Sequence, residues 1–152
     1  MRTTILALLV LLLFSCGQES EKAQLQFAKQ QAEFERDRLL LEKKNNILHH
    51  LNEYLPIRAH INVDVAWGGL DPGAMFIENK TGYDVQNVVI ALDVIKANGQ
   101  LYNTQYIEFN NLKNGDSQSK PTNAEPRGTS FRQRIIKIIG SELTNGQVIS
   151  AR

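Results

Sequence analysis

The chain has 152 residues with 17 basic and 16 acidic side chains, which gives a formal net charge of +1. A charge so nearly balanced attracts neither nucleic acid nor an anionic surface, so a nucleic-acid partner is not expected. A single cysteine excludes an internal disulfide. The length leaves room for one compact hydrophobic core and no second one.

The N-terminus carries a positive charge followed by a short apolar run. Arg2 precedes residues 5–14, which contain no polar side chain. The run is too short to cross a bilayer as a helix, which takes about 20 apolar residues. It has the length expected of the core of a secretory signal peptide. The pattern therefore predicts a targeting segment over residues 1–15 that is cleaved from the chain.

The apolar run ends in Leu13, Phe14, Ser15 and Cys16, which resembles the lipobox of bacterial lipoproteins. The resemblance implies cleavage before Cys16 and acylation of its sulfur, with the membrane as a partner. Each buried methylene contributes about 0.8 kcal/mol, so two or three acyl chains would anchor the protein stably. Gly17 stands where an aspartate would resemble an inner-membrane retention signal. We therefore expect the outer membrane, on either its periplasmic or its surface face.

Residues 19–54 contain no glycine or proline and are rich in residues that favour helices. At 1.5 Å per residue, such a helix would be about 50 Å long. Pro56 ends it. The sequence therefore predicts a lipid anchor and helical spacer over residues 16–55, followed by a separate domain over residues 56–152.

One apolar column runs along this predicted helix with a repeat of seven residues. Its members are Phe27, Phe34, Leu41, Leu48 and Leu55. A two-stranded coiled coil needs a second apolar column, but the positions three residues later read Gln30, Asp37, Lys44 and Leu51. We expect a solvated spacer whose C-terminal end, around Ile47, packs on the following domain. Homo-oligomerisation through the column, as a coiled-coil lipoprotein, is the alternative.

After Pro56 apolar and polar residues alternate, as in strands with one buried face. Turn residues separate these segments, most clearly Asn98 and Gly99, which favour a tight hairpin. The alternation favours a core position for Trp67, and a recognition aromatic near the turn at Gly68 and Gly69 is the alternative. Strands are expected over residues 57–67, 74–78, 85–96, 101–109 and 129–139, with a short one near 147–150 and a loop over 110–128. Several short strands separated by turns predict an antiparallel β-sandwich.

The order of these elements over residues 63–143 looks like the FxLYD-type domains of bacterial lipoproteins. The resemblance rests on the turn of residues 79–82, the long strand after it, the Asn98–Gly99 hairpin and a late strand after a polar loop. Residues 90–94 stand where the aromatic and aspartate of the naming motif would be. The resemblance implies an immunoglobulin-like sandwich. Together with the helical spacer predicted from composition, the expected fold is mainly β with one long α-helix. It implies no biochemical role.

No motif in the chain predicts catalysis, a cofactor or a metal site. His49 and His50 are adjacent on the predicted helix and point about 100° apart, so they cannot form the i, i+4 pair of helical metal sites. No serine has a nucleophile-elbow context, and no glycine-rich loop matches a phosphate site. We expect a non-catalytic binding or scaffold module for an envelope protein or glycan. A small envelope enzyme acting on carbohydrate or peptide is the alternative.

The last long strand has a basic character. Its positive residues, with one just before it, are Arg127, Arg132, Arg134 and Lys137. The alternation places Arg132 and Arg134 on one face. Solvated charges that discourage edge-to-edge aggregation are the favoured interpretation, and a patch for an anionic partner is the alternative. Asp64 and Asp93 are expected on exposed strand faces.

Overall fold

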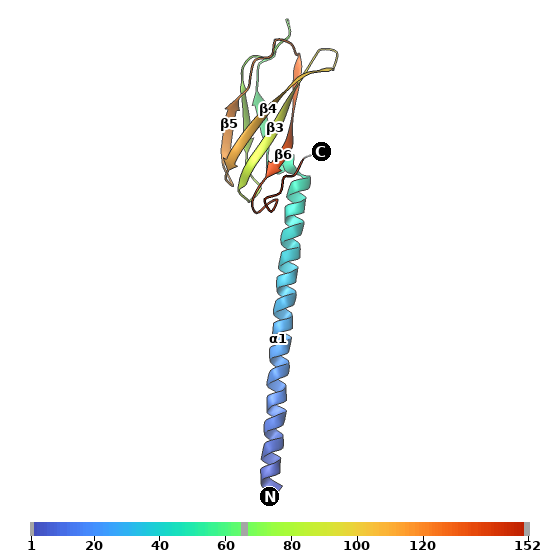
Figure 1. The fold of residues 1–152 in the computed structure, drawn as a ribbon, viewed down its shortest axis with the longest axis vertical. Helices are drawn as coiled ribbons and strands as arrows, with labels where there is room; N and C mark the ends of the chain where they lie inside the picture. The colour runs from blue at the N-terminus through green and yellow to red at the C-terminus, as the bar shows by residue number, and fades with distance from the viewer. Residues whose placement is uncertain (1, 65–66, 151–152) are drawn as a thin grey trace. The chain divides into compact units, whose positions relative to one another are not determined.

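The computed structural model describes the backbone of residues 2–64 and 67–150, and the side chains of residues 21–64 and 67–150. The chain is mainly β with one long helix (Figure 1). In the described residues, helices α1 (Arg2–His49) and α2 (Leu51–Tyr54) precede six strands. These are β1 (Ile57–His60), β2 (Ala74–Glu78), β3 (Val85–Ile95), β4 (Leu101–Leu112), β5 (Ser117–Pro121) and β6 (Ser130–Ile139).

The chain divides into two compact units, Met1–Lys43 and Lys44–Arg152. The first unit consists of α1 up to Lys43, and every described side chain of residues 21–43 is exposed. Helix-forming residues, rather than tertiary packing, account for its structure. The second unit, called the β-domain below, begins inside α1 and contains all the strands.

The last turn of α1 and the short α2 supply apolar side chains to the core of the β-domain. Ile47, Leu51 and Leu55 have exposed fractions of only 1%, 6% and 0%. They belong to the same buried cluster as the strand residues, and Leu48 packs against that cluster. The prediction that the C-terminal end of the helix packs on the following domain is confirmed.

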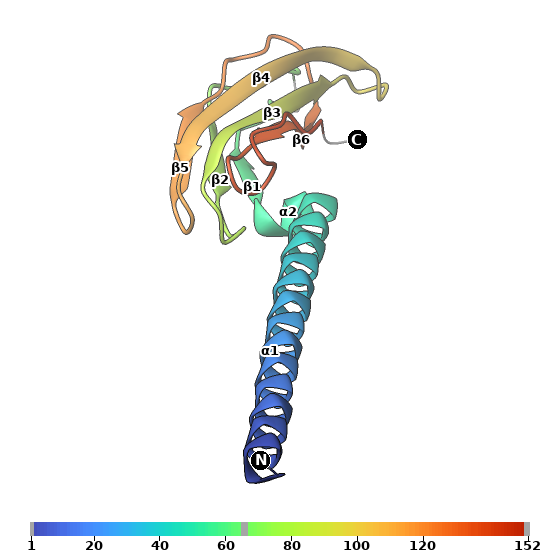
Figure 2. The ribbon, with the colours of Figure 1, turned by 60° about the horizontal axis from the view of Figure 1, so that its bottom comes forward.

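Two three-stranded antiparallel sheets form the β-domain, with strand orders β1-β2-β5 and β4-β3-β6 (Figure 2). Alternate residues of each sheet point into one shared core. From the first sheet the core takes Met75 and Ile77, and from the second it takes Val88, Ile90, Leu92, Ile107, Phe109, Ile135 and Ile138. The period-two pattern of the sequence therefore corresponds to one buried face on each sheet.

Two glutamine side chains connect the sheets at opposite edges. Gln118 Nε2 on β5 donates to the carbonyl of Asn110 on β4, at 3.1 Å. At the other edge, Gln133 Nε2 on β6 donates to the carbonyl of Ile57 on β1, also at 3.1 Å. Each bond satisfies a main-chain carbonyl near the rim of the core, so both edges are partly closed by side chains.

The C-terminal segment lies along the outer edge of β6. Ile149 and Ile138 exchange two backbone hydrogen bonds of 3.0 Å, which form one isolated antiparallel bridge. The short strand expected near residues 147–150 is thus reduced to a single paired residue.

The first predicted strand is shorter than expected. It ends at His60, and Trp67 has an exposed fraction of 91%, so the prediction that Trp67 lies in the core is wrong. The cause is a turn at Asp64, whose Oδ1 accepts the N–H of Trp67 at 3.1 Å while its carbonyl accepts the N–H of Gly68 at 2.8 Å. The turn interrupts the alternation before it reaches the tryptophan.

The loop predicted for residues 110–128 is also wrong in part. It contains the last residues of β4 and all of β5, which pairs with β2. β5 has mostly polar side chains and lies at the edge of its sheet, so it carries no apolar alternation that could identify it. The strands predicted over residues 74–78, 85–96 and 129–139 are confirmed to within one residue at each end.

Asn79, in the turn between β2 and β3, is fully buried and fully hydrogen-bonded. Its Nδ2 donates to the carbonyls of Tyr83 and Leu112, each at 2.9 Å. Its Oδ1 accepts the N–H of Thr81 at 3.0 Å and the hydroxyl of Thr81 at 2.7 Å. The side chain has two donors and two acceptor positions, and all are used. Asn79 therefore holds the turn against the end of β4.

Candidate functional site

The face of the β4-β3-β6 sheet that points away from the core carries most of the predicted basic residues. Residues paired directly across neighbouring strands share a face. The cross-strand rows on this face are Thr104, Asp93 and Arg132; then Tyr106, Ala91 and Arg134; then Glu108, Val89 and Lys137. We call these nine residues the outer face.

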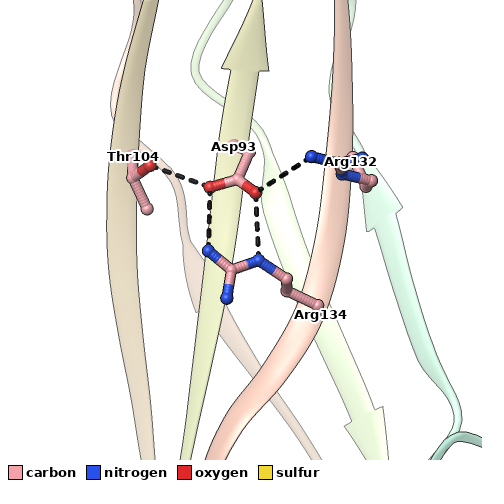
Figure 3. Close-up of polar contacts among 4 residues, drawn as sticks. All are labelled: Asp93, Thr104, Arg132 and Arg134. Atoms are coloured by element: carbon pink, nitrogen blue, oxygen red, sulfur yellow. Dashed lines mark hydrogen bonds and ion pairs between the residues drawn. The ribbon is translucent and has the colours of Figure 1, made fainter. Parts of the chain in front are cut away.

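Asp93 lies on the central strand of the outer face, between Thr104 and Arg132, and its side chain is only 3% exposed. Its Oδ1 accepts the hydroxyl of Thr104 at 2.8 Å, and its Oδ2 accepts Nε–H of Arg134 at 3.1 Å. Arg134 Nη2 lies 3.5 Å from Oδ1, so the guanidinium contacts both oxygens (Figure 3). Arg132 Nη2 is 3.8 Å from Oδ2. One carboxylate thus fixes two guanidinium groups.

The expectation that Asp93 lies on an exposed strand face is wrong, because longer side chains from β4 and β6 cover it. Burial disfavours its charged form. The hydrogen bonds from Arg134 and Thr104, with the charges of Arg134 and Arg132, outweigh this effect and hold the pKa of Asp93 below its ordinary value. The side chains of Arg132 and Arg134 remain 69% and 51% exposed. The cluster therefore presents positive charge to solvent.

Replacing Asp93 with asparagine is expected to lower the free energy of unfolding by about 2 kcal/mol at pH 7, because hydrogen bonds to a charged group are lost. The folded-state pKa lies below the unfolded one, so this stabilisation is present above the unfolded pKa and is lost as pH falls through the folded pKa. Urea unfolding of both proteins at neutral and acidic pH should show their difference narrowing below about pH 4. A difference that stays constant would contradict this account.

The structure brings together three of the four predicted basic residues. Arg132, Arg134 and Lys137 lie on the outer face, whereas Arg127 lies in the loop between β5 and β6. Strict alternation would put Lys137 and Arg134 on opposite faces. A register shift in the β3–β6 pairing, opposite Val89, returns Lys137 to the side of the arginines.

The apolar column of the helix divides at the boundary of the β-domain. Phe27, Phe34 and Leu41 are 62%, 72% and 57% exposed, whereas Leu48 packs against the core and Leu55 is fully buried in it. Leu48 and Leu55 therefore pack in the β-domain, as one of the two predicted roles of the column required. An oligomer seam through the first three stays a prediction.

The predicted lipidation site lies outside the part of the chain whose side chains are described. For Cys16 the structure describes the backbone alone, which is part of α1. Within residues 21–64 and 67–150, no helix is long and apolar enough to cross a membrane. The same residues contain no group of three potential metal-binding side chains.

A hollow of about 710 Å³ lies within the β-domain where α2 meets β6 and the C-terminal segment. His49, His50, Glu53 and Arg134 are among its lining residues, with an apolar contribution from Ile149. His50 Nδ1 lies 3.7 Å from Glu53 Oε1, and both side chains are largely exposed. The two histidines thus line an open, mixed surface.

A second hollow of about 430 Å³ runs along β4 and includes Tyr106 and Glu125. Sequence reasoning missed both residues. Tyr106 stands at an exposed position of a strand that was predicted from its buried residues alone. Glu125 lies in the segment that was predicted to be a loop. Neither lies in a motif that would have marked it.

No family model matches the chain, and no curated protein matches it. Among solved structures, β-glucosidase 3B from Thermotoga neapolitana in complex with α-D-glucose is similar over 55% of this chain, with 15% identity and a TM-score of 0.30. The matched part is 11% of that chain. A likeness of this extent supports no conclusion about fold or activity.

Proposed function

We propose that this chain is a lipoprotein of the bacterial cell envelope, anchored to the outer membrane through acylated Cys16. The observation that carries the proposal is the N-terminal sequence: Arg2, the apolar residues 5–14, and a small residue, Ser15, directly before the sole cysteine. The exposed helical residues 21–43 are compatible with a solvated spacer behind such an anchor.

The β-domain is, in this proposal, an immunoglobulin-like sandwich that binds or scaffolds another envelope component. The strand order supports the fold, since the first, second and fifth strands share one sheet while the fourth, third and sixth share the other. Immunoglobulin-like domains distribute their A, B, E and C′, C, F strands in this way. The bridge at Ile149 stands beside β6, where the G strand of such a domain would lie.

The outer face supports a binding role. Tyr106 is 68% exposed and Arg134 is about half exposed, and these residue types are enriched among the side chains that dominate binding energy at interfaces. Asp93 already holds the arginines in place, which lowers the entropy cost of ordering them on binding. The partner class is an envelope protein or a glycan.

Mass spectrometry of the protein purified from membranes tests the anchor. We expect the wild-type chain to begin at Cys16 and to carry the mass of fatty acyl groups, whereas Cys16→Ser carries none. Ser15→Ala is the matched control, because it keeps a small residue before the cysteine and should be processed like the wild type. A wild-type protein with an unmodified Cys16, or one cleaved at another position, would overturn the proposal.

Self-assembly through the helix is a second candidate. The observation in its favour is the exposure of Phe27, Phe34 and Leu41, three large apolar side chains at a spacing of seven residues. Such spacing forms a seam in coiled coils. In that case the lipoprotein would present several β-domains from one bundle of spacers.

A further inference from the structure

A groove of about 430 Å³ runs along the edge of β4 that is not paired with β3. Residues 103–108 of β4 form one side, and Lys120, Pro121, Asn123 and Glu125 form the other. Polar side chains predominate in this lining. The groove contains three groups with distinct binding chemistry: a buried carboxylate, side-chain amides and one exposed aromatic ring.

The carboxylate belongs to Glu125, which is only 8% exposed. Its Oε1 accepts hydrogen bonds from Asn103 Nδ2 at 2.7 Å and from Gln105 Nε2 at 2.9 Å. Gln105 is itself fixed by two bonds with the backbone of Asn123, at 2.9 and 3.0 Å. Both amide bonds of Glu125 end on the same oxygen, so its second oxygen keeps acceptor capacity. A charged acceptor is therefore held rigidly in the groove wall.

Glu125 is also fixed through its backbone. It exchanges two hydrogen bonds with Leu70, at 2.8 and 2.9 Å, and Leu70 is itself buried. The carboxylate therefore needs little reorganisation to accept hydrogen bonds from a ligand, which favours binding.

The aromatic ring belongs to Tyr106, which is 68% exposed on the groove-lining part of β4. An aromatic face offers a flat apolar surface, and its hydroxyl remains available for hydrogen bonding. Tyr106 points to the outer side of β4, whereas Asn103 and Gln105, which hold Glu125, point to its core side. We propose that this groove binds a neutral glycan chain that crosses the edge of β4, with one sugar ring stacked on Tyr106 and hydroxyls of a neighbouring sugar donating to Glu125. The proposal rests on the binding role proposed above and names the ligand class.

Charge favours this ligand over the other polymers of the envelope. Among the residues that line the groove, the carboxylates of Glu108 and Glu125 outnumber the single ammonium of Lys120, while Arg132 and Arg134 lie on β6, two strands away. The lining itself therefore disfavours phosphate and uronate groups. A protein partner is also disfavoured. The centres of protein interfaces are depleted of charged residues, whereas this groove is lined by Glu108, Lys120 and Glu125. Sugar hydroxyls are donors that a carboxylate binds strongly, because the hydrogen bond is charge-assisted.

Titration of the protein as it is recovered from cells, whatever its N-terminus, with cellotetraose and chitotetraose, both neutral, tests the proposal in a zwitterionic detergent without sugar groups. We expect nuclear magnetic resonance shifts in the backbone amides of residues 103–108, 120 and 122–125. Tyr106→Ala and Glu125→Gln should each raise the dissociation constant about tenfold or more. Tyr102→Ala, which changes a tyrosine of the same strand outside the groove lining, should bind like the wild type.

Each outcome decides the proposal. Absence of shifts with both neutral tetrasaccharides, or tighter binding of the anionic tetragalacturonate at the same amides, overturns it. Equal affinity of Glu125→Gln, Tyr106→Ala and wild type also overturns it. The anchor experiment is independent, because the titration does not depend on how the N-terminus was processed. Recovery of shortened oligosaccharides would support glycan binding and would contradict the non-catalytic role proposed above.

Discussion

Replacement of Asn79 with alanine is expected to lower the free energy of unfolding of the β-domain by about 4 kcal/mol. The substitution removes four hydrogen bonds, and it leaves the carbonyl of Leu112 without its side-chain donor and the N–H of Thr81 without its side-chain acceptor. The carbonyl of Tyr83 keeps the hydroxyl of Thr81 at 2.9 Å. Each buried polar group left unsatisfied costs about 1–3 kcal/mol. The effect is large because Asn79 is fully buried, so water does not replace the lost partners.

Urea unfolding followed by near-ultraviolet circular dichroism measures this effect in the β-domain. All four tyrosines of the chain lie in this unit, so their signal reports its packing. Asn62→Ala is the control, since Asn62 is exposed and its substitution should change the free energy by less than about 0.5 kcal/mol. Similar unfolding midpoints for the two variants would show that Asn79 does not hold the turn as described.

The second large effect is expected within the apolar column of the helix. Leu55→Ala should lower the free energy of unfolding of the β-domain by about 3 kcal/mol, because it leaves a cavity in a packed core. Phe34→Ala removes a larger side chain of the same column but should change this free energy by less than about 0.5 kcal/mol, since Phe34 is 72% exposed. The same urea unfolding experiment compares the two.

Light scattering on these two variants separates packing from assembly. If the column is an oligomer seam, Phe34→Ala should reduce the molar mass of the assembled protein while Leu55→Ala leaves it unchanged. An identical mass for wild type and Phe34→Ala would exclude the assembly candidate. Equal destabilisation by the two substitutions would contradict the division of the column at the β-domain boundary.

Much of the fold could be predicted because its elements have a strong local signal. The helical segment is marked by its composition and ends at Tyr54, just before Pro56, although the break at His50 between α1 and α2 was not predicted. β3 shows four apolar residues on one face between clear turns. In both cases the residues that determine the structure are neighbours in the chain. The burial of Ile47 and Leu55 follows from the same pattern, because apolar residues at the end of a helix need a surface to cover them.

The parts that could not be predicted depend on contacts between distant segments. The burial of Asp93 is produced by side chains of β4 and β6, 11 and 41 residues away. The position of Lys137 depends on a register shift that leaves no mark in the sequence. Alternation also gave no reason to end β1 before Trp67, because the turn depends on the conformation of Asp64.

The candidate groove could not be predicted either, because it is also formed by segments that are distant in the sequence. Glu125 and Tyr106 are 19 residues apart and come from a polar segment and the exposed side of a strand. Hydrogen bonds from Asn103 and Gln105 to Glu125, and those between Gln105 and Asn123, bring these segments together. A search for motifs examines spacing along the chain, and these residues have no characteristic spacing.

The exposure of Trp67 has a practical consequence for spectroscopy. It is the sole tryptophan of the chain, and the turn at Asp64 leaves its indole almost fully in water. Its fluorescence should therefore have nearly the same emission maximum in the folded and unfolded protein and would be a poor probe of unfolding. The same indole is a site-specific reporter of anything that docks on this loop, since a blue shift would signal its transfer out of water.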